Sequence, residues 1–322
     1  MSRAIRLSIL VPLALSWLCG SALAQVTNST KNPNQIAILR WYPANQTTSF
    51  ALPSSYKALA FDGANIWVTT RDTSVSKVRA SDGALLGTFL IPGGPMEMAF
   101  DGANIWVTTT GPRGLTKLRA SDGTVLGNFT VGFNPQGIVF DGANIWVAAN
   151  DGFLYKLRAS DGLQLGAFNL GHFNTTGTMA FDGANIWVTD NDQENVKKVR
   201  ASDGVLLGAF AVGSFPTGVA FDGANIWVSN GSRAGGPNTL SKLRASDGAL
   251  LGAFPVGSGL NGVAFDGANI WVTTTDGAVS KLRASDGTVL GTFPVAGAPA
   301  EVVFDGANIW VGNFQLVSLS KL

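Results

Sequence analysis

The chain has 322 residues, of which 46% are hydrophobic and 40 are glycine, and its 22 basic and 21 acidic side chains nearly cancel. That balance excludes the strongly basic surface by which a protein binds nucleic acid or an anionic membrane. The single cysteine, Cys19, excludes a disulfide framework and a cysteine-ligated metal.

The chain begins with the pattern of a secretory signal peptide. A basic n-region precedes an apolar run over 7–18, and an Ala-x-Ala cleavage motif ends at Ala24, directly before Gln25. The run is too short to span a bilayer, and no later segment is apolar over the roughly 20 residues that a spanning helix needs. We therefore expect residues 1–24 to be removed and the mature protein to be secreted or periplasmic, without a transmembrane anchor. Residues 25–35 are expected to form a flexible lead.

The rest of the chain is built from one repeated unit. The segment Phe-Asp-Gly-Ala-Asn-Ile-Trp-Val occurs seven times, and successive tryptophans are 39 to 44 residues apart: Trp67, Trp106, Trp146, Trp187, Trp227, Trp271 and Trp310. A fixed period near forty residues indicates units that cannot bury their apolar face alone and must stack on copies of themselves.

Each unit reads as four short strands. In residues 218–257, four runs rich in Val, Ile, Leu and Phe are separated by Asp-Gly or other glycine-rich turns: Val219–Phe221, Ile226–Ser229, Leu240–Arg244 and Leu250–Val256. No helical period is present. The Ile-Trp-Val strand is apolar on both faces, so a neighbouring sheet must cover each side, with the tryptophan buried between sheets.

Radial stacking of such sheets predicts an all-β, seven-bladed β-propeller of four-stranded antiparallel blades over 36–322. We expect Thr48–Leu52 to become the outer strand of the last blade and so to close the ring. Ile36–Arg40 and Val317–Leu322 both match the third strand, and the N-terminal copy is the one expected to be an extra edge strand.

The units resemble the propeller repeats called YVTN and NHL types, with Ile-Trp-Val-Thr-Thr and its variants in place of Tyr-Val-Thr-Asn. The resemblance covers about residues 36–322. Streptogramin B lyase has similar units and implies an elimination reaction that uses histidine, acidic residues and a magnesium ion. This chain departs from that pattern, because it has one histidine and three glutamates, and fold similarity alone does not confer an activity.

Comparison of the units divides the predicted disc into two faces. The turns after the first and third strands share one end of every blade and are nearly identical; we call this end the constant face. The loops after the second strand and between blades share the other end and differ between units; we call it the variable face. Because loops on a rigid scaffold often carry function, we expect ligand binding on the variable face, by Arg71, Arg113, Arg233, Phe133, Phe173 and Phe215.

Catalytic and metal sites are weaker hypotheses. His172 is the single candidate imidazole base, with Glu97 or Glu301, placed in interblade loops, as an acid near the axis; a solvated loop histidine is the alternative. Asp190, Asp192 and Glu194 are spaced like part of a calcium loop but lack its glycine and distant glutamate. We therefore assign no cofactor, and a divalent cation stays an alternative to a solvated acidic hairpin.

The Lys-x-Arg motif of each third strand is interpreted as structural, with long stems lying over the next blade and the charged heads paired with the aspartates of the turns. Taken together, the sequence favours an exported binding or interaction module that captures a protein, glycan or small molecule on the variable face and is not an enzyme. The alternative is a lyase or hydrolase of the streptogramin-lyase type with a site near the axis.

Overall fold

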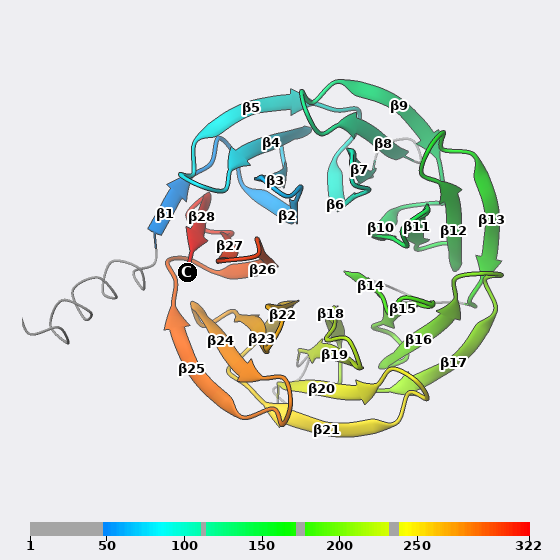
Figure 1. Ribbon diagram of the computed structural model, residues 1–322, viewed down its shortest axis with the longest axis vertical. Coiled ribbons are helices and arrows are strands. Elements are labelled where there is room, and N and C mark those ends of the chain that lie inside the picture. The colour runs from blue at the N-terminus through cyan, green and yellow to red at the C-terminus, as the bar shows by residue number, and fades with distance from the viewer. Residues whose placement is uncertain (1–47, 111–113, 172–177, 232–237) are drawn as a thin grey trace, which may run out of the picture. The chain divides into compact units, whose positions relative to one another are not determined.

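The computed structural model describes residues 48–110, 114–171, 178–231 and 238–322. Within these ranges every regular element is a strand, and 28 strands form seven four-stranded antiparallel sheets. The sheets follow one another around a ring as the blades of a propeller, as predicted (Figure 1). Residues 47–322 form one unit.

The innermost strand of each blade begins on the variable face and ends at the Asp-Gly-Ala-Asn turn on the constant face. In the order of blades 1 to 7, the inner strands are β2 (Tyr56–Phe61), β6 (Pro95–Phe100), β10 (Pro135–Phe140), β14 (Met179–Phe181), β18 (Pro216–Phe221), β22 (Leu260–Phe265) and β26 (Pro299–Phe304).

The second strand carries the repeated tryptophan and returns to the variable face. These strands are β3 (Asn65–Thr70), β7 (Asn104–Thr109), β11 (Asn144–Ala149), β15 (Asn185–Asp190), β19 (Asn225–Asn230), β23 (Asn269–Thr274) and β27 (Ile309–Asn313). As the two-faced apolar pattern requires, their Ile, Trp and Val side chains are buried.

The third strand of blades 1 to 6 holds the Lys-x-Arg motif, and that of blade 7 has Lys321 at the lysine position. The third strands are β4 (Ser74–Arg79), β8 (Gly114–Arg119), β12 (Phe153–Arg158), β16 (Asn195–Arg200), β20 (Thr239–Arg244), β24 (Ala278–Arg283) and β28 (Ser318–Lys321). The outer strands are β5 (Leu85–Leu90), β9 (Val125–Thr130), β13 (Gln164–Asn169), β17 (Leu206–Ala211), β21 (Leu250–Pro255), β25 (Val289–Pro294) and, in blade 7, β1 (Thr48–Ala51).

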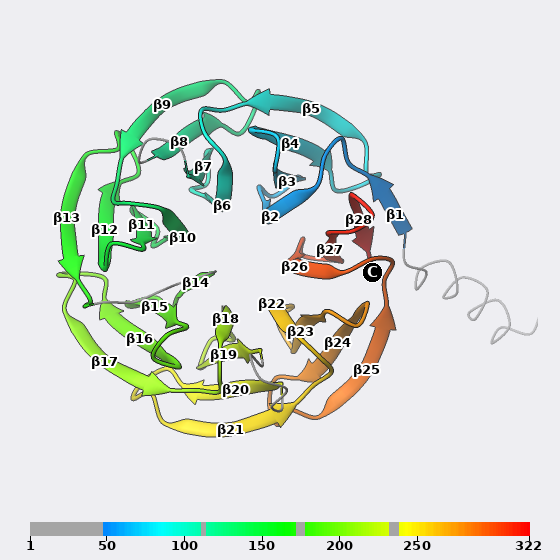
Figure 2. The ribbon, with the colours of Figure 1, turned by 180° about the vertical axis from the view of Figure 1, so that it is seen from behind.

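The two ends of the chain close the ring. Strand β1 pairs antiparallel with β28, with Thr48 opposite Lys321 and Ala51 opposite Ser318. Both views place β1 at the rim beside β28 (Figure 2). The predicted closure is therefore confirmed, and the C-terminal copy supplies the third strand. The other copy, Ile36–Arg40, lies outside the described residues.

The core lies between blades rather than within them. The Trp187 side chain is fully buried and packs in one cluster with Val219, Ile226 and Leu243 of the next blade. Its indole Nε1 donates a hydrogen bond to Asp182 at 2.8 Å, and Phe210 of its own outer strand lies 5.7 Å from it between ring centroids. Equivalent clusters recur around the ring, so each blade is stabilised by its neighbours.

The lysines of the Lys-x-Arg motif do not pair with aspartates, and this part of the sequence interpretation is wrong. Lys198 Nζ lies 5.2 Å from the centre of the Trp187 ring and donates to the carbonyls of Ala245 and Ser246 in the next blade, at 2.6 and 3.0 Å. The arginines alone take the turn aspartates, as Arg200 does with Asp203 at 2.9 Å. A buried ammonium needs hydrogen-bond acceptors that are shielded from water and held in place, and the backbone carbonyls of the next blade supply them.

Candidate functional site

Part of the predicted ligand-binding surface lies outside the described residues: Arg113, Arg233, Phe173 and the candidate base His172. The described members of that prediction are Arg71, Phe133 and Phe215, and they lie at three different parts of the variable face. Phe215 precedes β18 in a left-handed conformation, with φ of 54°.

Phe133 is 65% exposed and borders a cavity of about 350 Å³ between blades 2 and 3. Asp151 and Tyr155 also line this cavity, and the Asp151 carboxylate accepts hydrogen bonds from the Phe133 amide at 2.9 Å and the Tyr155 hydroxyl at 2.8 Å. An exposed ring beside a fixed carboxylate can contact a ligand, and ligand binding by Phe133 stays a prediction.

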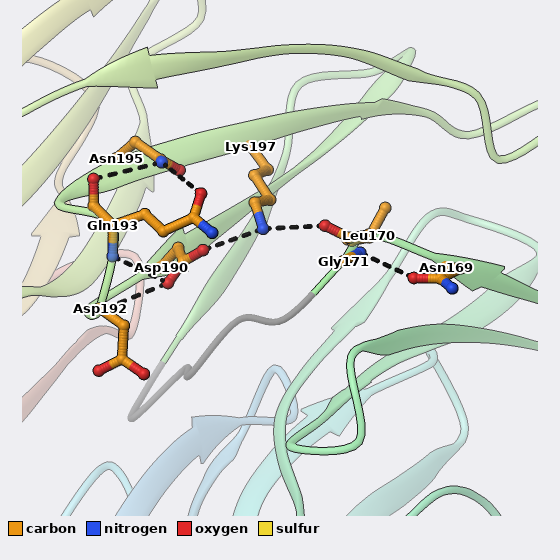
Figure 3. A network of polar contacts seen from close by, with 8 residues as sticks. All are labelled: Asn169, Leu170, Gly171, Asp190, Asp192, Gln193, Asn195 and Lys197. Atoms are coloured by element: carbon orange, nitrogen blue, oxygen red, sulfur yellow. Dashed lines mark hydrogen bonds and ion pairs between the residues drawn. The ribbon is translucent and has the colours of Figure 1, made fainter.

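Of the acidic residues in the hairpin of blade 4, Asp190 is buried, whereas Asp192 and Glu194 are exposed. Asp190 is fully buried and forms an ion pair with Lys197 at 2.9 Å, while Lys197 also donates to the carbonyl of Leu170 at 3.0 Å (Figure 3). The Asp192 carboxylate points away from Asp190 in this view. In the described part of the chain no three His, Cys, Asp or Glu side chains converge as metal ligands. The structure therefore does not bring Asp190, Asp192 and Glu194 together.

Arg71 joins the two blades at which the chain closes. Its guanidinium stacks on the ring of Phe314, 4.4 Å from the ring centre, so the loop of blade 1 contacts that of blade 7. It also repels the ammonium of Lys57: burial lowers the pKa of Lys57, Arg71 lowers it further, and Glu97 opposes the change. Arg71 is thus near a group of charges that the sequence interpretation had not gathered into one site.

The inner strands carry a β-bulge close to the variable face. In blade 2 the register shifts between Pro95 and Met98, and the amide of Glu97 donates to the Thr108 hydroxyl at 3.0 Å instead of continuing the ladder. The Thr108 hydroxyl also bonds the Gln136 carbonyl of the next blade at 3.2 Å. Bulges of this kind redirect side chains and are frequent beside functional sites.

In blades 5 and 6 the bulge residue is a glycine, because the backbone of the next blade leaves no room for a side chain there. A Cβ on Gly262 would lie 2.6 Å from the Ala300 carbonyl, and Gly218 is equally confined by the Asn261 carbonyl. Blades 2 and 7 have Glu97 and Glu301 at this position, on inner strands rather than in the predicted interblade loops. Both are partly exposed. Two large acidic side chains thus lie on either side of blade 1, at a position where the other five blades have glycine, alanine or threonine.

The pocket for Tyr56 is specific to this junction. Blade 7 has Gly312 where other second strands have Thr, Ser or, in blade 3, Ala148, and the Tyr56 ring of blade 1 fills the space that a side chain there would need. The Tyr56 hydroxyl donates to the Gly312 carbonyl at 2.5 Å and accepts from the Ala300 amide at 3.0 Å. Burial raises the pKa of Tyr56, and the charge of Glu301 adds to the rise, so the phenol stays protonated.

Lys57, Arg71, Glu97 and Glu301 form what we call the charged sector, spread over blades 7, 1 and 2. Burial raises the pKa of the Glu97 carboxyl well above its usual range; repulsion from Glu301 adds to the rise and Lys57 opposes it. Burial also raises the pKa of Glu301. Among the described residues, neither glutamate forms an ion pair within 4.0 Å. The Lys57 ammonium points to Met96, with Nζ 2.9 Å from Sδ.

Two carboxyls that disfavour each other's charge can bind a cationic group or exchange a proton near neutral pH. At the neighbouring position, the inner strands of blades 3, 5 and 6 have neutral side chains: Gln136, Thr217 and Asn261. The ring therefore has one charged and one neutral side. Aligning the units could have revealed this, because Glu97 and Glu301 stand where blades 3, 5 and 6 have glycine and blades 1 and 4 have Ala58 and Thr178. Assigning the glutamates to loops hid the signal.

Comparisons with known proteins support the fold alone. No protein-family model and no curated protein matches the sequence. Among solved structures, the chain is similar to one described as Kuenenia stuttgartiensis hydrazine synthase, with a TM-score of 0.74 over 84% of this chain and 96% of that one, at 14% identity. Such a likeness shows a shared propeller architecture and transfers no activity. Separately, the described ranges contain no helix that could cross a bilayer.

Proposed function

We propose that the protein is an exported binding module whose ligand docks on the variable face at the charged sector. The observation that carries the proposal is the pair of glutamates that lack an ion-pair partner among the described residues, at a position where the other five blades have glycine, alanine or threonine. A near-symmetric scaffold gains the ability to hold a ligand in one orientation where its symmetry is broken. Here the break falls at the junction of blades 7, 1 and 2.

The chemistry of the sector points to a ligand with both signs of charge. Glu97 and Glu301 favour an ammonium or guanidinium group, because a bound cation stabilises carboxylates that otherwise repel each other. Lys57 and the outward edge of Arg71 favour a carboxylate or phosphate on the same molecule. A peptide or a small zwitterion meets both conditions. Export rests on the signal-peptide pattern of residues 1–24.

Thermal stability in the presence of small ligands tests this proposal. We expect zwitterionic or cationic compounds in a panel of amino acids, polyamines and short peptides to raise the melting temperature, since a ligand that binds only the folded state stabilises it. The double variant Glu97→Gln/Glu301→Gln should lose the shift. Glu194→Gln is the matched control, because Glu194 is the third glutamate of the chain, lies on blade 4 and is exposed.

An equal ligand shift in the double variant and the wild type would contradict the proposal, as would a shift given by anionic compounds alone. Isothermal titration with the best compound then measures the loss directly. Replacement of both glutamates should lower its affinity by at least tenfold, about 1.4 kcal/mol.

One observation favours a second candidate function, a lyase or hydrolase. Burial raises the pKa values of both Glu97 and Glu301, and the charge of Glu301 raises that of Glu97 further. Two neighbouring carboxyls of this kind are the pattern of a general acid and a general base. The resemblance of the repeats to YVTN and NHL types and to streptogramin B lyase points the same way. A streptogramin B antibiotic is the direct probe: ring opening followed by mass spectrometry should vanish in Glu301→Gln, and an absence of ring opening by the wild type removes this candidate.

A further inference from the structure

The constant face, opposite the charged sector, carries a groove between neighbouring blades. Grooves of about 500, 530 and 620 Å³ lie between blades 7 and 1, blades 4 and 5, and blades 1 and 2. Each is lined by the Asp-Gly-Ala-Asn turns of both blades and by the Arg-Ala-Ser segment that follows one third strand. The same residues occur at three more junctions. One feature is thus repeated around a single face.

The charges that border each groove are already compensated. Between blades 1 and 2, Arg119 forms an ion pair with Asp122 at 2.9 Å, and Lys77 donates to backbone carbonyls. Asp62 accepts from Trp67 at 2.7 Å and from the side chain and amide of Asn65. A charged ligand would have to displace one of these partners, so the groove suits a neutral molecule.

The groups that remain available are hydroxyls, amides and an aromatic ring. The Ser121 side chain is exposed, and the ring of Phe100 borders the groove with part of its surface accessible. Asn104 is partly exposed; its side-chain nitrogen donates to Asp101, so its side-chain oxygen is the group that can accept from a ligand. Arg119 keeps further N–H donors beyond its ion pair. Donors and acceptors arranged beside an aromatic ring match a sugar, which offers hydroxyls at its edge and C–H groups on its face.

The alanine of the Asp-Gly-Ala-Asn turn gives an independent reason to regard the groove as a site. It is exposed, it lines the groove, and it is alanine in all seven units. Exposed positions of the outer strand have changed between units of the same origin: Thr88, Asn128, Ala167, Ala209, Ala253 and Thr292. The backbone at Ala64 is not left-handed, so folding does not require a small side chain. A larger one would fill the groove.

We infer that the constant face binds a neutral saccharide polymer through its repeated grooves. A single shallow groove holds one sugar weakly, but a ring of equivalent grooves on one face engages many units of the polymer at once. Linked sites of this kind raise the overall affinity by about 10²–10⁴-fold without any new contact. This site is separate from the charged sector and does not depend on it.

Retention on immobilised neutral polysaccharides tests the inference, with a panel of β-glucan, mannan and xylan beads and soluble oligosaccharides as competitors. We expect the wild type to bind at least one polymer and to be released by its oligosaccharide at millimolar concentration. The triple variant Ala64→Gln/Ala103→Gln/Ala224→Gln blocks the three observed grooves and should lower the apparent affinity by at least tenfold. The matched control is Ala167→Gln/Ala209→Gln/Ala253→Gln, three exposed alanines of the outer strands.

The apparent affinity for the polymer should fall further with each additional groove that is blocked, because avidity depends on the number of linked sites. Equal losses in the groove variant and the outer-strand variant would overturn the inference, and so would a wild type that binds none of the polymers. Glu97→Gln/Glu301→Gln should bind the polymer like the wild type. Loss of polymer binding in that variant would instead assign the polymer to the charged sector.

Discussion

At the scale of single residues, each blade depends on a tryptophan whose ring is buried between blades and whose indole N–H has a hydrogen-bond acceptor. Asp182 accepts hydrogen bonds from the indole of Trp187, from the amides of Ala184 and Asn185, and from the Asn185 side chain. Burial opposes the charge of Asp182, but these hydrogen bonds outweigh it and lower the pKa of the carboxyl. Asp182 therefore both holds the turn in place and accepts the hydrogen bond of the buried indole N–H.

Asp182→Ala should lower the free energy of unfolding by about 2–3 kcal/mol, because the indole N–H of Trp187 would be left buried without an acceptor. Asp203→Ala is the control: its carboxylate forms a half-exposed ion pair with Arg200, which contributes about 0–1 kcal/mol. Urea denaturation of both variants gives the comparison. Equal losses would mean that the buried hydrogen bond adds nothing.

The glutamates of the charged sector predict how stability depends on pH. In the folded protein the carboxyl groups of Glu97 and Glu301 hold their protons above the ordinary glutamate pKa of 4.5. Over that interval the folded state binds more protons than the unfolded state, so stability should fall as the pH rises from about 5 through neutrality, by about 1.4 kcal/mol for each unit of pKa shift. The aspartates of the Asp-Gly-Ala-Asn turns, such as Asp182, have lowered pKa values. Their titration therefore changes the stability of the protein only at a pH below this interval.

Urea midpoints measured at pH 5 and pH 8 test this dependence. The wild type and Glu194→Gln should lose stability between the two values, and Glu97→Gln/Glu301→Gln should lose much less. A double variant with the same fall as the wild type would show that these two groups do not titrate in the interval.

At the scale of strands and turns, each outer strand fastens its blade to the next. Phe168 of blade 3 lies 5.6 Å from Trp146 between ring centroids, and its ring occupies the space beside Gly204 in the third-to-fourth-strand turn of blade 4. Gly204 has φ of 75°, so this glycine both adopts a left-handed turn and leaves room for a neighbouring ring. In blade 7 the same role falls to Phe50 of β1, which packs on Trp310 and beside Gly83.

Gly204→Ala and Gly183→Ala separate these two requirements. Gly183 has φ of 95° with nothing near the added Cβ, so its substitution costs only backbone strain, about 1–2 kcal/mol. At Gly204 the added Cβ would also overlap the Phe168 ring, and we expect a further loss of about 1–3 kcal/mol. The two melting curves decide the matter: coincident curves would mean that Phe168 moves aside freely.

At the scale of the whole ring, one junction differs from the other six. The third and outer strands of blade 7 come from opposite ends of the chain, so no Ala-Ser-Asp-Gly turn connects them. Lys281 of blade 6 lies over Trp271 at 4.8 Å but makes no carbonyl hydrogen bond among the described residues, and Trp271 is 7% exposed where the other six tryptophans are fully buried. The junction of blades 6 and 7 therefore has fewer contacts than its counterparts.

We predict that this junction opens first. Hydrogen exchange should be faster in β25 and β27 than in the equivalent strands β17 and β19. Lys198→Met leaves two carbonyls without a donor and should cost about 2 kcal/mol, whereas Lys281→Met should cost less than about 1 kcal/mol. Uniform protection around the ring, together with equal losses in both variants, would mean that the missing turn does not weaken the junction.

The repeat, the four strands of each unit, the number of blades and the closure by Thr48–Leu52 could be predicted from the amino-acid sequence, because these follow from period, alternation and turn residues. The position of the tryptophans between blades could be predicted too, since the Ile-Trp-Val strand is apolar on both faces. Only the tertiary structure gave each buried lysine its carbonyl partners and gathered Lys57, Glu97 and Glu301 across three blades. Contacts between residues some 40 to 240 positions apart depend on bulges and on the rotation from blade to blade, and no local pattern encodes these.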